Sequence, residues 1–407
     1  MSRLALIAAV FLGLGLAVVA GNVRSEEAPT VSRALAKPLK AANDALAAKN
    51  FAEVIAKTKE AGAMSPKTAY DEFVINYLQV GAYSGMGNTA EMGPAMERTI
   101  DSPYLPAAAK VPYLKALMTL AYQNKNYDKA VQYGERVKAA GDTNADVALT
   151  VAQANYLLGK YKEALTEMDA IESRDEAAGH KPSEKGLNII WSCAIKLKDD
   201  AAASKAIEKL ILNYPKPDYW SNAMVPILQN HSNDDRLNLM TYRLMYEVGI
   251  LKRGADYRDM AQIALDQGNP GEAQTVIEQA LAKNLFTEQR EKESNQRLLD
   301  AAKKKGVQDK ATLERDTKDA MAAASGDPLV QLGGAYLGYG QPDKAVTNIN
   351  AGIAKGKLKN PDEAYMLLGI AQERSKNGAE AVRAFNKATS DPKYARLAKL
   401  WVLQARG

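Results

Sequence analysis

The stretch KNYDKAVQYGERVKAAGDTNADVALTVAQANYLLGKYKEA, residues 125–164, decides how this chain folds. It begins and ends with the same phrase, which is a turn residue, a tyrosine, a charged pair and an alanine. The two alanines, Ala130 and Ala164, are 34 residues apart. Between the phrases, apolar residues recur every three or four positions, which is the spacing of amphipathic α-helices. Glycine, asparagine and aspartate interrupt this spacing and mark turns. The stretch therefore predicts a repeating unit of two short helices.

The phrase recurs towards both ends of the chain. It returns at residues 340–345 and 377–381, and the alanines there, Ala345 and Ala381, are 36 residues apart. Versions at Ala203 and Ala273 are 70 residues apart, which is two repeat lengths. Weaker units are spaced between these, around Val54, Met92, Leu237 and Ala311. Together they predict an all-α chain of about ten helical hairpins from Thr30 to the C-terminus.

The composition supports a helical protein and excludes most catalytic designs. Aromatic residues make up only 7% of the 407 residues, and alanine, the best helix former, is abundant. The net charge of +5 is small and spread along the chain, so we expect no nucleic-acid partner. One cysteine, Cys193, and two histidines, His180 and His231, do not suffice for a Cys/His zinc site. We expect no cofactor, no metal and no enzymatic activity.

The N-terminal residues have the pattern of a secretory signal peptide. Arg3 is followed by an apolar run from Leu4 to Ala20 that ends in Val-Val-Ala, and a polar stretch begins at Gly21. This pattern predicts a signal peptide at residues 1–20 and a periplasmic mature chain. The alternative is an uncleaved anchor, because the run is close to the minimum length for crossing a membrane. A membrane contact is expected only through that uncleaved segment.

The period and the phrase resemble those of the tetratricopeptide repeat. Leu332-Gly333 and Tyr336 precede Ala345 as the Leu-Gly…Tyr element of that family does, and Leu368-Gly369 precedes Ala381. Ile207, Leu210 and Pro215 follow Ala203 at the family's offsets. The resemblance covers nearly the whole mature chain. It implies an α-solenoid, a right-handed superhelix of hairpins, in which small residues let the helices cross closely.

Two stretches interrupt the repeats. Residues 172–186 lengthen a connection, and residues 284–320 are highly charged, with Lys303-Lys304-Lys305 among them. We expect residues 284–320 to form a solvated helix pair, or alternatively a flexible seam. The predicted organisation is therefore residues 21–283 as N-terminal and central repeats, and residues 284–407 as the charged helix pair followed by C-terminal repeats.

The resemblance also implies a partner site. In this family the first helices of successive hairpins line a concave surface that holds an extended peptide or a partner helix. The family pattern assigns ten polar or aromatic residues to that surface: Lys115, Thr119, Tyr122, Gln123, Gln153, Tyr156, Lys185, Asn188, Ser192 and Lys196. It also assigns Leu149 and Leu157 to the same surface. The surface is polar, mildly basic and partly aromatic, which suits a peptide of some acidic character. The family's carboxylate clamp is not supported, because Thr119 stands where an asparagine is needed.

Other motifs favour structural roles. The Gly85–Ala90 match to a dinucleotide-binding pattern is expected to be a turn inside a repeat. His180 and His231 are expected at the surface or in caps, and acidic pairs such as Asp234-Asp235 are expected to cap helices. Met224, Met240, Met245 and Met260 indicate a packed core, or alternatively an adaptable groove. The aromatic stretch 214–220 is either a staple for a degenerate repeat or a rim contact for a ligand.

These observations favour an exported, non-catalytic repeat scaffold that binds a protein or peptide. A subunit of a cell-envelope assembly or export machine remains as an alternative. A small-molecule carrier and an α/α-toroid enzyme are further alternatives with less support, because such an enzyme needs an aromatic cleft and an acid/base pair.

Overall fold

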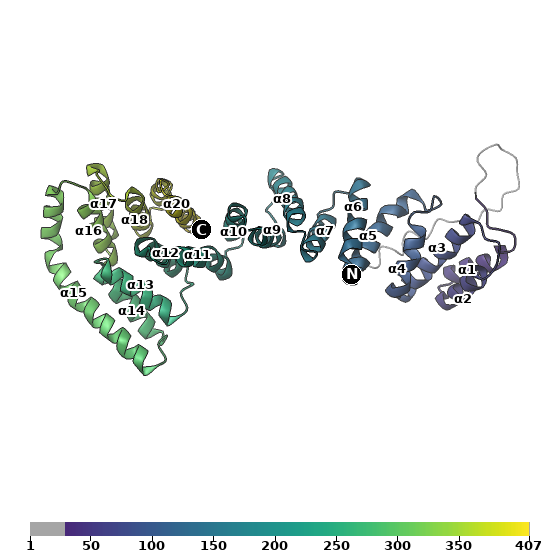
Figure 1. Cartoon of the computed structure of the whole chain (residues 1–407), viewed down its shortest axis with the longest axis horizontal. Helices are drawn as coiled ribbons and strands as arrows, with labels where there is room; N and C mark the ends of the chain where they lie inside the picture. The colour runs from purple at the N-terminus through teal and green to yellow at the C-terminus, as the bar shows by residue number, and fades with distance from the viewer. Residues whose placement is uncertain (1–28, 407) are drawn as a thin grey trace. The chain divides into compact units, whose positions relative to one another are not determined.

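The computed structural model describes residues 29–406, so the expected signal peptide lies outside the described residues. The described part contains α-helices and no β-strand, which confirms the all-α prediction. Figure 1 labels the helices. Their bounds are α1 Ala36–Ala47, α2 Phe51–Gly62, α3 Ala69–Met86, α4 Thr89–Thr99, α5 Ala107–Gln123, α6 Tyr127–Ala139, α7 Ala145–Leu157, α8 Tyr161–Ala177, α9 Glu184–Leu197, α10 Asp200–Asn213, α11 Pro217–Asn230, α12 Asp235–Glu247, α13 Gly254–Asp266, α14 Pro270–Ala282, α15 Gln289–Ala322, α16 Asp327–Gly338, α17 Pro342–Lys355, α18 Pro361–Arg374, α19 Gly378–Phe385 and α20 Pro392–Arg406. None of the helices within residues 29–406 is both long and apolar enough to cross a membrane.

The recurring phrase is the turn of a helical hairpin. In the two most similar copies, Lys125 and Gly159 adopt the left-handed conformation with φ of 60° and 76°, and the second helix starts two residues later. A residue with positive φ ends the first helix and reverses the chain. Gly87 does the same at φ 67°, so the Gly85–Ala90 match is a turn, as expected.

The phrase alanines pack where the helices of a hairpin cross. Ala130, Ala164, Ala273, Ala345 and Ala381 are all 0% exposed. Ala203 of α10 is also buried, but the main contacts of α10 are with α11 and α20 and not with α9. The Leu-Gly element makes the matching contact from the first helix: a Cβ added to Gly369 would lie within 3.0 Å of three atoms of the Phe385 ring. A glycine permits that approach, and Gly333 makes the same close contact with Ile349 in the preceding hairpin.

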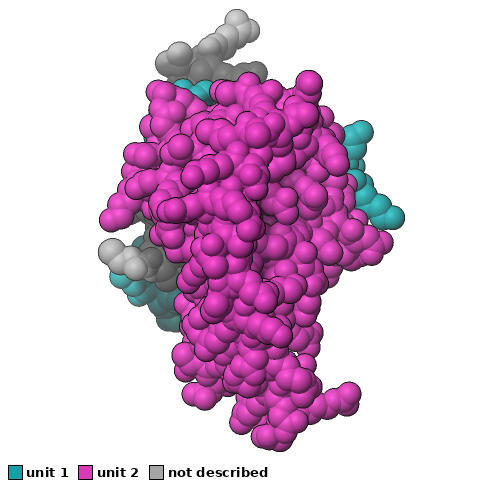
Figure 2. All heavy atoms as spheres, turned by 90° about the vertical axis from the view of Figure 1, so that its left-hand side faces the viewer, with its two compact units in different colours: residues 1–199 teal, residues 200–407 magenta. Residues whose placement is uncertain are grey.

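The chain divides into two compact units, residues 1–199 (unit 1) and 200–407 (unit 2), coloured separately in Figure 2. The division falls at the turn between α9 and α10, and the boundary expected at residues 283/284 lies inside unit 2. Unit 1 holds the hairpins α1–α2, α3–α4, α5–α6 and α7–α8, followed by α9. Unit 2 holds α10, the hairpins α11–α12, α13–α14, α16–α17 and α18–α19, and the unpaired α15 and α20.

The charged segment is a single helix, so the expected helix pair and the unit expected around Ala311 are wrong. α15 runs unbroken for 34 residues and is drawn as one long helix in Figure 1. The segment has no proline, and its only glycine, Gly306, leaves the helix intact. The Tyr339 hydroxyl bonds to the Gly306 carbonyl and the Asp309 carboxylate, so the middle of α15 is held against the end of α16. The repeat period is lost here because one side of this helix packs against both α14 and α16.

Candidate functional site

The candidate face of unit 1 is formed by the first helices of its hairpins. α1 contacts α3, α5 contacts α7, and α7 contacts α9 directly. The second helices are bridged instead by long side chains, such as Lys129 of α6 to Glu97 of α4 at 2.6 Å and Lys138 of α6 to Glu167 of α8 at 2.8 Å. Backbones that lie closer together form the inner side of a curved stack. The first-helix face is therefore the concave face of unit 1.

The residues expected on this face lie on α5, α7 and α9. Four of them are exposed: Thr119, Gln123, Lys185 and Lys196. The remaining six are partly exposed: Lys115, Tyr122, Gln153, Tyr156, Asn188 and Ser192. None is buried in the core, so all ten side chains have access to solvent. Leu157 is 49% exposed, which is unusual for a large apolar side chain.

Hydrogen bonds link four of these residues in pairs. The Tyr122 hydroxyl donates to Gln153 Oε1 at 3.4 Å and joins α5 to α7. Lys115 Nζ is 2.5 Å from an Asp142 carboxylate oxygen, and the Thr119 hydroxyl donates to the Lys115 carbonyl oxygen. Because Lys115 already has a carboxylate partner, it does not offer a free charge to a ligand. This agrees with the absence of a carboxylate clamp.

Two tyrosine pairs mark the ends of α5 and α7. Tyr122 meets Tyr127 edge-on at 5.6 Å between ring centroids, and Tyr156 meets Tyr161 in the same way at 5.3 Å. The two pairs are 34 residues apart, and all four rings are partly exposed. Tyr127 and Tyr161 were not expected among the site residues, because they begin the second helices. Their place in the repeated phrase, five residues after Tyr122 and Tyr156, was the sequence signal that could have identified them.

The second-helix face of unit 1 is neutralised by its own ion pairs. Burial acts to raise the pKa of Glu97, but bonds from Lys129 and from the Tyr133 hydroxyl hold it below its usual value. Similar pairs join Arg136 to Asp101 and Lys160 to Asp128. Charges that are satisfied within the chain offer less to a partner.

The first-helix face of the C-terminal repeats is covered by the chain itself. α16 packs on α14, and α20 packs on α10 and α12. The positions of α18 that correspond to Lys115 and Thr119 are Met366 and Ile370, and both are 0% exposed. Nine consecutive residues of α12, 237–245, are buried, since other helices surround it. This arrangement was not expected from the sequence, and it buries the positions of α18 that correspond to Lys115 and Thr119.

Ion pairs between residues far apart in sequence hold this arrangement together. Arg374 of α18 lies 2.8 Å from Glu247 of α12, and Lys393 of α20 lies 2.5 Å from Asp234, the residue that caps α12. Inside the unit, Arg243 and Glu272 form a two-bonded pair at 2.8 and 2.6 Å with side chains only 2% and 6% exposed. A buried pair of this geometry fixes how α12 sits on α14.

The remaining candidate groups have structural roles. Cys193 is buried, and burial raises the pKa of its thiol to about 11, so the thiolate is scarce at neutral pH. His231 ends α11, and His180 is exposed in a loop. All four central methionines are buried, as the packed-core interpretation predicts. Tyr219 and Trp220 are buried at the start of α11, which favours the staple over the ligand rim. No group of residues within 29–406 is arranged to hold a metal ion.

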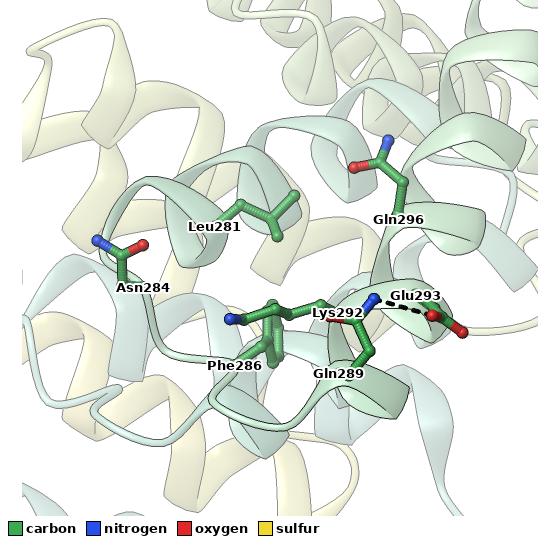
Figure 3. A pocket seen from close by; sticks show the side chains of 7 residues that line it. All are labelled: Leu281, Asn284, Phe286, Gln289, Lys292, Glu293 and Gln296. Carbon is green, nitrogen blue, oxygen red and sulfur yellow. Dashed lines mark hydrogen bonds between the residues drawn. The ribbon is translucent and has the colours of Figure 1, made fainter.

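A pocket of about 480 Å³ lies where α14 meets α15, and Figure 3 shows its lining side chains. Leu281 and the buried Phe286 contribute apolar atoms, and the other lining residues are exposed and polar. The Gln289 amide donates to Glu293 at 2.9 Å, and the Gln296 amide donates to Asp300 at 2.9 Å. Because these amides bond within α15, the pocket presents few groups prepared for a ligand.

Comparisons with known proteins bear on the family. Residues 330–395, from within α16 to the start of α20, match the model described as tetratricopeptide repeat, which confirms the resemblance there. No curated protein sequence gives a significant match.

Among solved structures, a tetratricopeptide repeat protein from Parabacteroides merdae is 12% identical, with 81% of this chain and 98% of that chain covered and a TM-score of 0.30. The Naa15/Naa10 structure bound to HypK-THB is 14% identical, with 88% and 59% covered and a TM-score of 0.41. The TPR2AB domain of yeast Sti1 in complex with pHSP90 is 14% identical, with 74% and 100% covered and a TM-score of 0.25.

Proposed function

Because residues 330–395 match the model of the tetratricopeptide repeat, we propose that this chain is a repeat scaffold that binds another protein or peptide. Its repeats have the fold of proteins that commonly mediate protein–protein interaction. We place the binding site on the first-helix face of unit 1, over α5, α7 and α9. The scaffold supplies surface and geometry and performs no catalysis.

The contrast between two equivalent faces is the observation that carries this proposal. On α5, Lys115 and Thr119 reach solvent, whereas the corresponding Met366 and Ile370 of α18 are buried under the chain's own helices. A face that the chain does not cover, lined by polar and tyrosine side chains, has the composition of a protein interface. The non-catalytic part of the proposal rests on the inert thiol and on the structural positions of the two histidines.

Site-specific photo-crosslinking tests the location. A benzophenone side chain at Thr119 or Gln123 should form adducts with a partner in an extract of the source cells. The same group at Gln132, which is exposed on the second helix α6, is the matched control and should not. Equal adduct formation at Gln132 and Thr119, or none at Thr119, would contradict the placement.

We also propose that the scaffold works in the periplasm of a bacterium. The apolar run from Leu4 to Ala20 after Arg3 supports export and cleavage before Gly21. Intact mass of the mature protein tests this, with Gly21 as the expected first residue. A membrane-bound chain that retains Leu4–Ala20 would show instead that the segment is an anchor.

A further inference from the structure

Carboxylates are scarce on α5, α7 and α9, the three helices of the proposed face. α5 has none, α7 has only Asp146 and α9 has only Glu184, and both of these lie in the first turn of their helix. The second helices α4 and α6 carry two each, and α8 carries six. An acidic partner would therefore meet little repulsion on the first-helix face over α5, α7 and α9.

One edge of that face combines aromatic and basic side chains. α5, α7 and α9 each pack against an antiparallel second helix and run in the same direction, so their C-terminal ends lie along one edge, which we name the turn edge. The tyrosine pairs Tyr122/Tyr127 and Tyr156/Tyr161 lie here, beside the exposed Leu157. Tyr127, Tyr156 and Tyr161 make no hydrogen bond through their hydroxyl groups within residues 29–406. Partly exposed tyrosines with unused hydroxyl groups are characteristic of binding surfaces.

Free positive charges flank these rings. Lys125 is in the turn after α5, Lys162 is in the first turn of α8, and Lys196 is in the last turn of α9. All three are exposed, and none pairs with a carboxylate in the part of the chain that the structure describes. Of the carboxylates on this edge, Asp128 is already paired with Lys160 at 3.3 Å, and Glu163 is exposed in the first turn of α8 beside Lys162. Lys125 also has φ of 60°, a conformation in which glycine or asparagine costs less than lysine.

We propose that the turn edge binds an acidic segment of a partner protein in which apolar side chains alternate with carboxylates. The apolar side chains lie against Leu157 and the two tyrosine pairs, and the carboxylates face Lys125, Lys162 and Lys196. This proposal rests on the proposed function and specifies the partner's chemistry and the edge that holds it.

The middle of the first-helix face is less suited to hold the carboxylates. Lys115, the basic residue there, is 2.5 Å from Asp142 and is neutralised. The Tyr122 hydroxyl and Gln153 are bonded to each other, so their polar atoms are partly occupied. The unpaired Lys125, Lys162 and Lys196 of the turn edge therefore suit the carboxylates better than the paired Lys115 in the centre of the face.

The probe is a fluorescein-labelled synthetic peptide that alternates aspartate and glutamate with leucine and phenylalanine, titrated with the full chain by fluorescence anisotropy. A Lys125→Glu/Lys162→Glu variant should weaken binding by about tenfold or more, because two attractive contacts become repulsive. The matched control is Lys110→Glu, an exposed and unpaired lysine at the other end of α5, which should leave the affinity unchanged. The affinity for the unmodified chain should also fall with added salt.

Three results would overturn the proposal: no binding of the acidic peptide, equal affinity for a peptide with lysine in place of every acidic residue, or equal losses in the Lys110→Glu and double variants. Sedimentation with phosphatidylglycerol vesicles that is lost in the double variant, without peptide binding, would assign the edge to an anionic membrane instead. Crosslinking from Thr119 is scored separately. If adducts form there while the peptide fails, the scaffold function stands and only the turn-edge inference falls.

Discussion

Gly369→Ala tests the contact that defines the repeat. Gly369 of α18 faces Phe385 of α19, and an added Cβ would lie within 3.0 Å of three ring atoms. Phe385 cannot rotate away easily, because it is 0% exposed and stacks on Trp401 at 5.5 Å between centroids. The substitution therefore forces α18 and α19 apart, or moves two buried aromatic rings.

Two opposing effects set the magnitude. Replacing a glycine inside a helix by alanine stabilises by about 0.5–1 kcal/mol through backbone entropy. Overpacking a well-filled site costs about 1–3 kcal/mol, and a clash this close belongs at the upper end. We expect a net loss of about 2 kcal/mol. Gly306→Ala in α15 is the matched control, because its new Cβ would lie 3.7 Å from the nearest atom, the Tyr339 hydroxyl oxygen. That variant should gain about 0.5–1 kcal/mol.

Urea unfolding followed by circular dichroism measures both variants, which lie in the same unit. Adding Phe385→Leu to Gly369→Ala should restore part of the loss, since the pair is in contact, with a coupling of about 0.5–3 kcal/mol. A neutral or stabilising Gly369→Ala would refute the packing argument. So would strictly additive effects in the double variant, because the loss would then not arise from Phe385.

Three further predictions concern stability, each measured by urea unfolding. Ala164→Leu, at a fully buried helix crossing, should lower the free energy of unfolding by about 1–3 kcal/mol. Ala178→Leu, at the exposed end of α8, should lower it by under about 0.5 kcal/mol. Equal losses would contradict the placement of Ala164 at a crossing. Burial alone would raise the pKa of Asp71, but hydrogen bonds from Ser32 and Thr68 lower it, so its contribution is present above about pH 3.9 and is lost as the pH falls through the lowered value. Asp71→Asn should cost about 1–3 kcal/mol at neutral pH and less in acid, and a loss independent of pH would rule this out. Arg243→Met should lower the free energy of unfolding by about 3–5 kcal/mol, because it leaves Glu272 buried and unpaired. The double variant Arg243→Met/Glu272→Leu should recover most of that loss. If it does not, the loss does not arise from the broken ion pair.

The local architecture could be predicted from the sequence because the packing rule is local. Alanine at a helix crossing recurs with the repeat, and glycine opposite a large side chain occurs in the two C-terminal copies, so Ala130, Ala164 and Gly369 indicate their contacts directly. The unit around Ala311 was inferred from spacing alone. Gly306 and Asp309-Lys310-Ala311 repeat part of the phrase at this point, yet the structure has one continuous helix there.

The fold-back of the C-terminal repeats could not be predicted in the same way. Its ion pairs join residues 127 and 159 positions apart, and no repeat period relates them. The sequence did contain a weak signal of the covered face. Met366 and Ile370 of α18 are apolar, whereas the corresponding positions of α5 are polar, and apolar residues at such positions indicate that other helices cover them. The site residues on α5, α7 and α9 were placed at accessible positions by family offsets, and whether they bind a partner remains a prediction.

The burial of α12 has a consequence for the order in which the protein acquires its structure. Asp234 at the start of α12 meets Lys393, which is 159 residues later in the chain. At about 5–20 residues per second, ribosomal synthesis leaves an interval of about 8–30 s before that partner exists. Throughout this interval the apolar side of α12 that α20 later covers is open to water, and it is available to holding chaperones or to aggregation. The hairpins of unit 1 need only their sequence neighbours and have no such delay, so newly made chains are most vulnerable in unit 2.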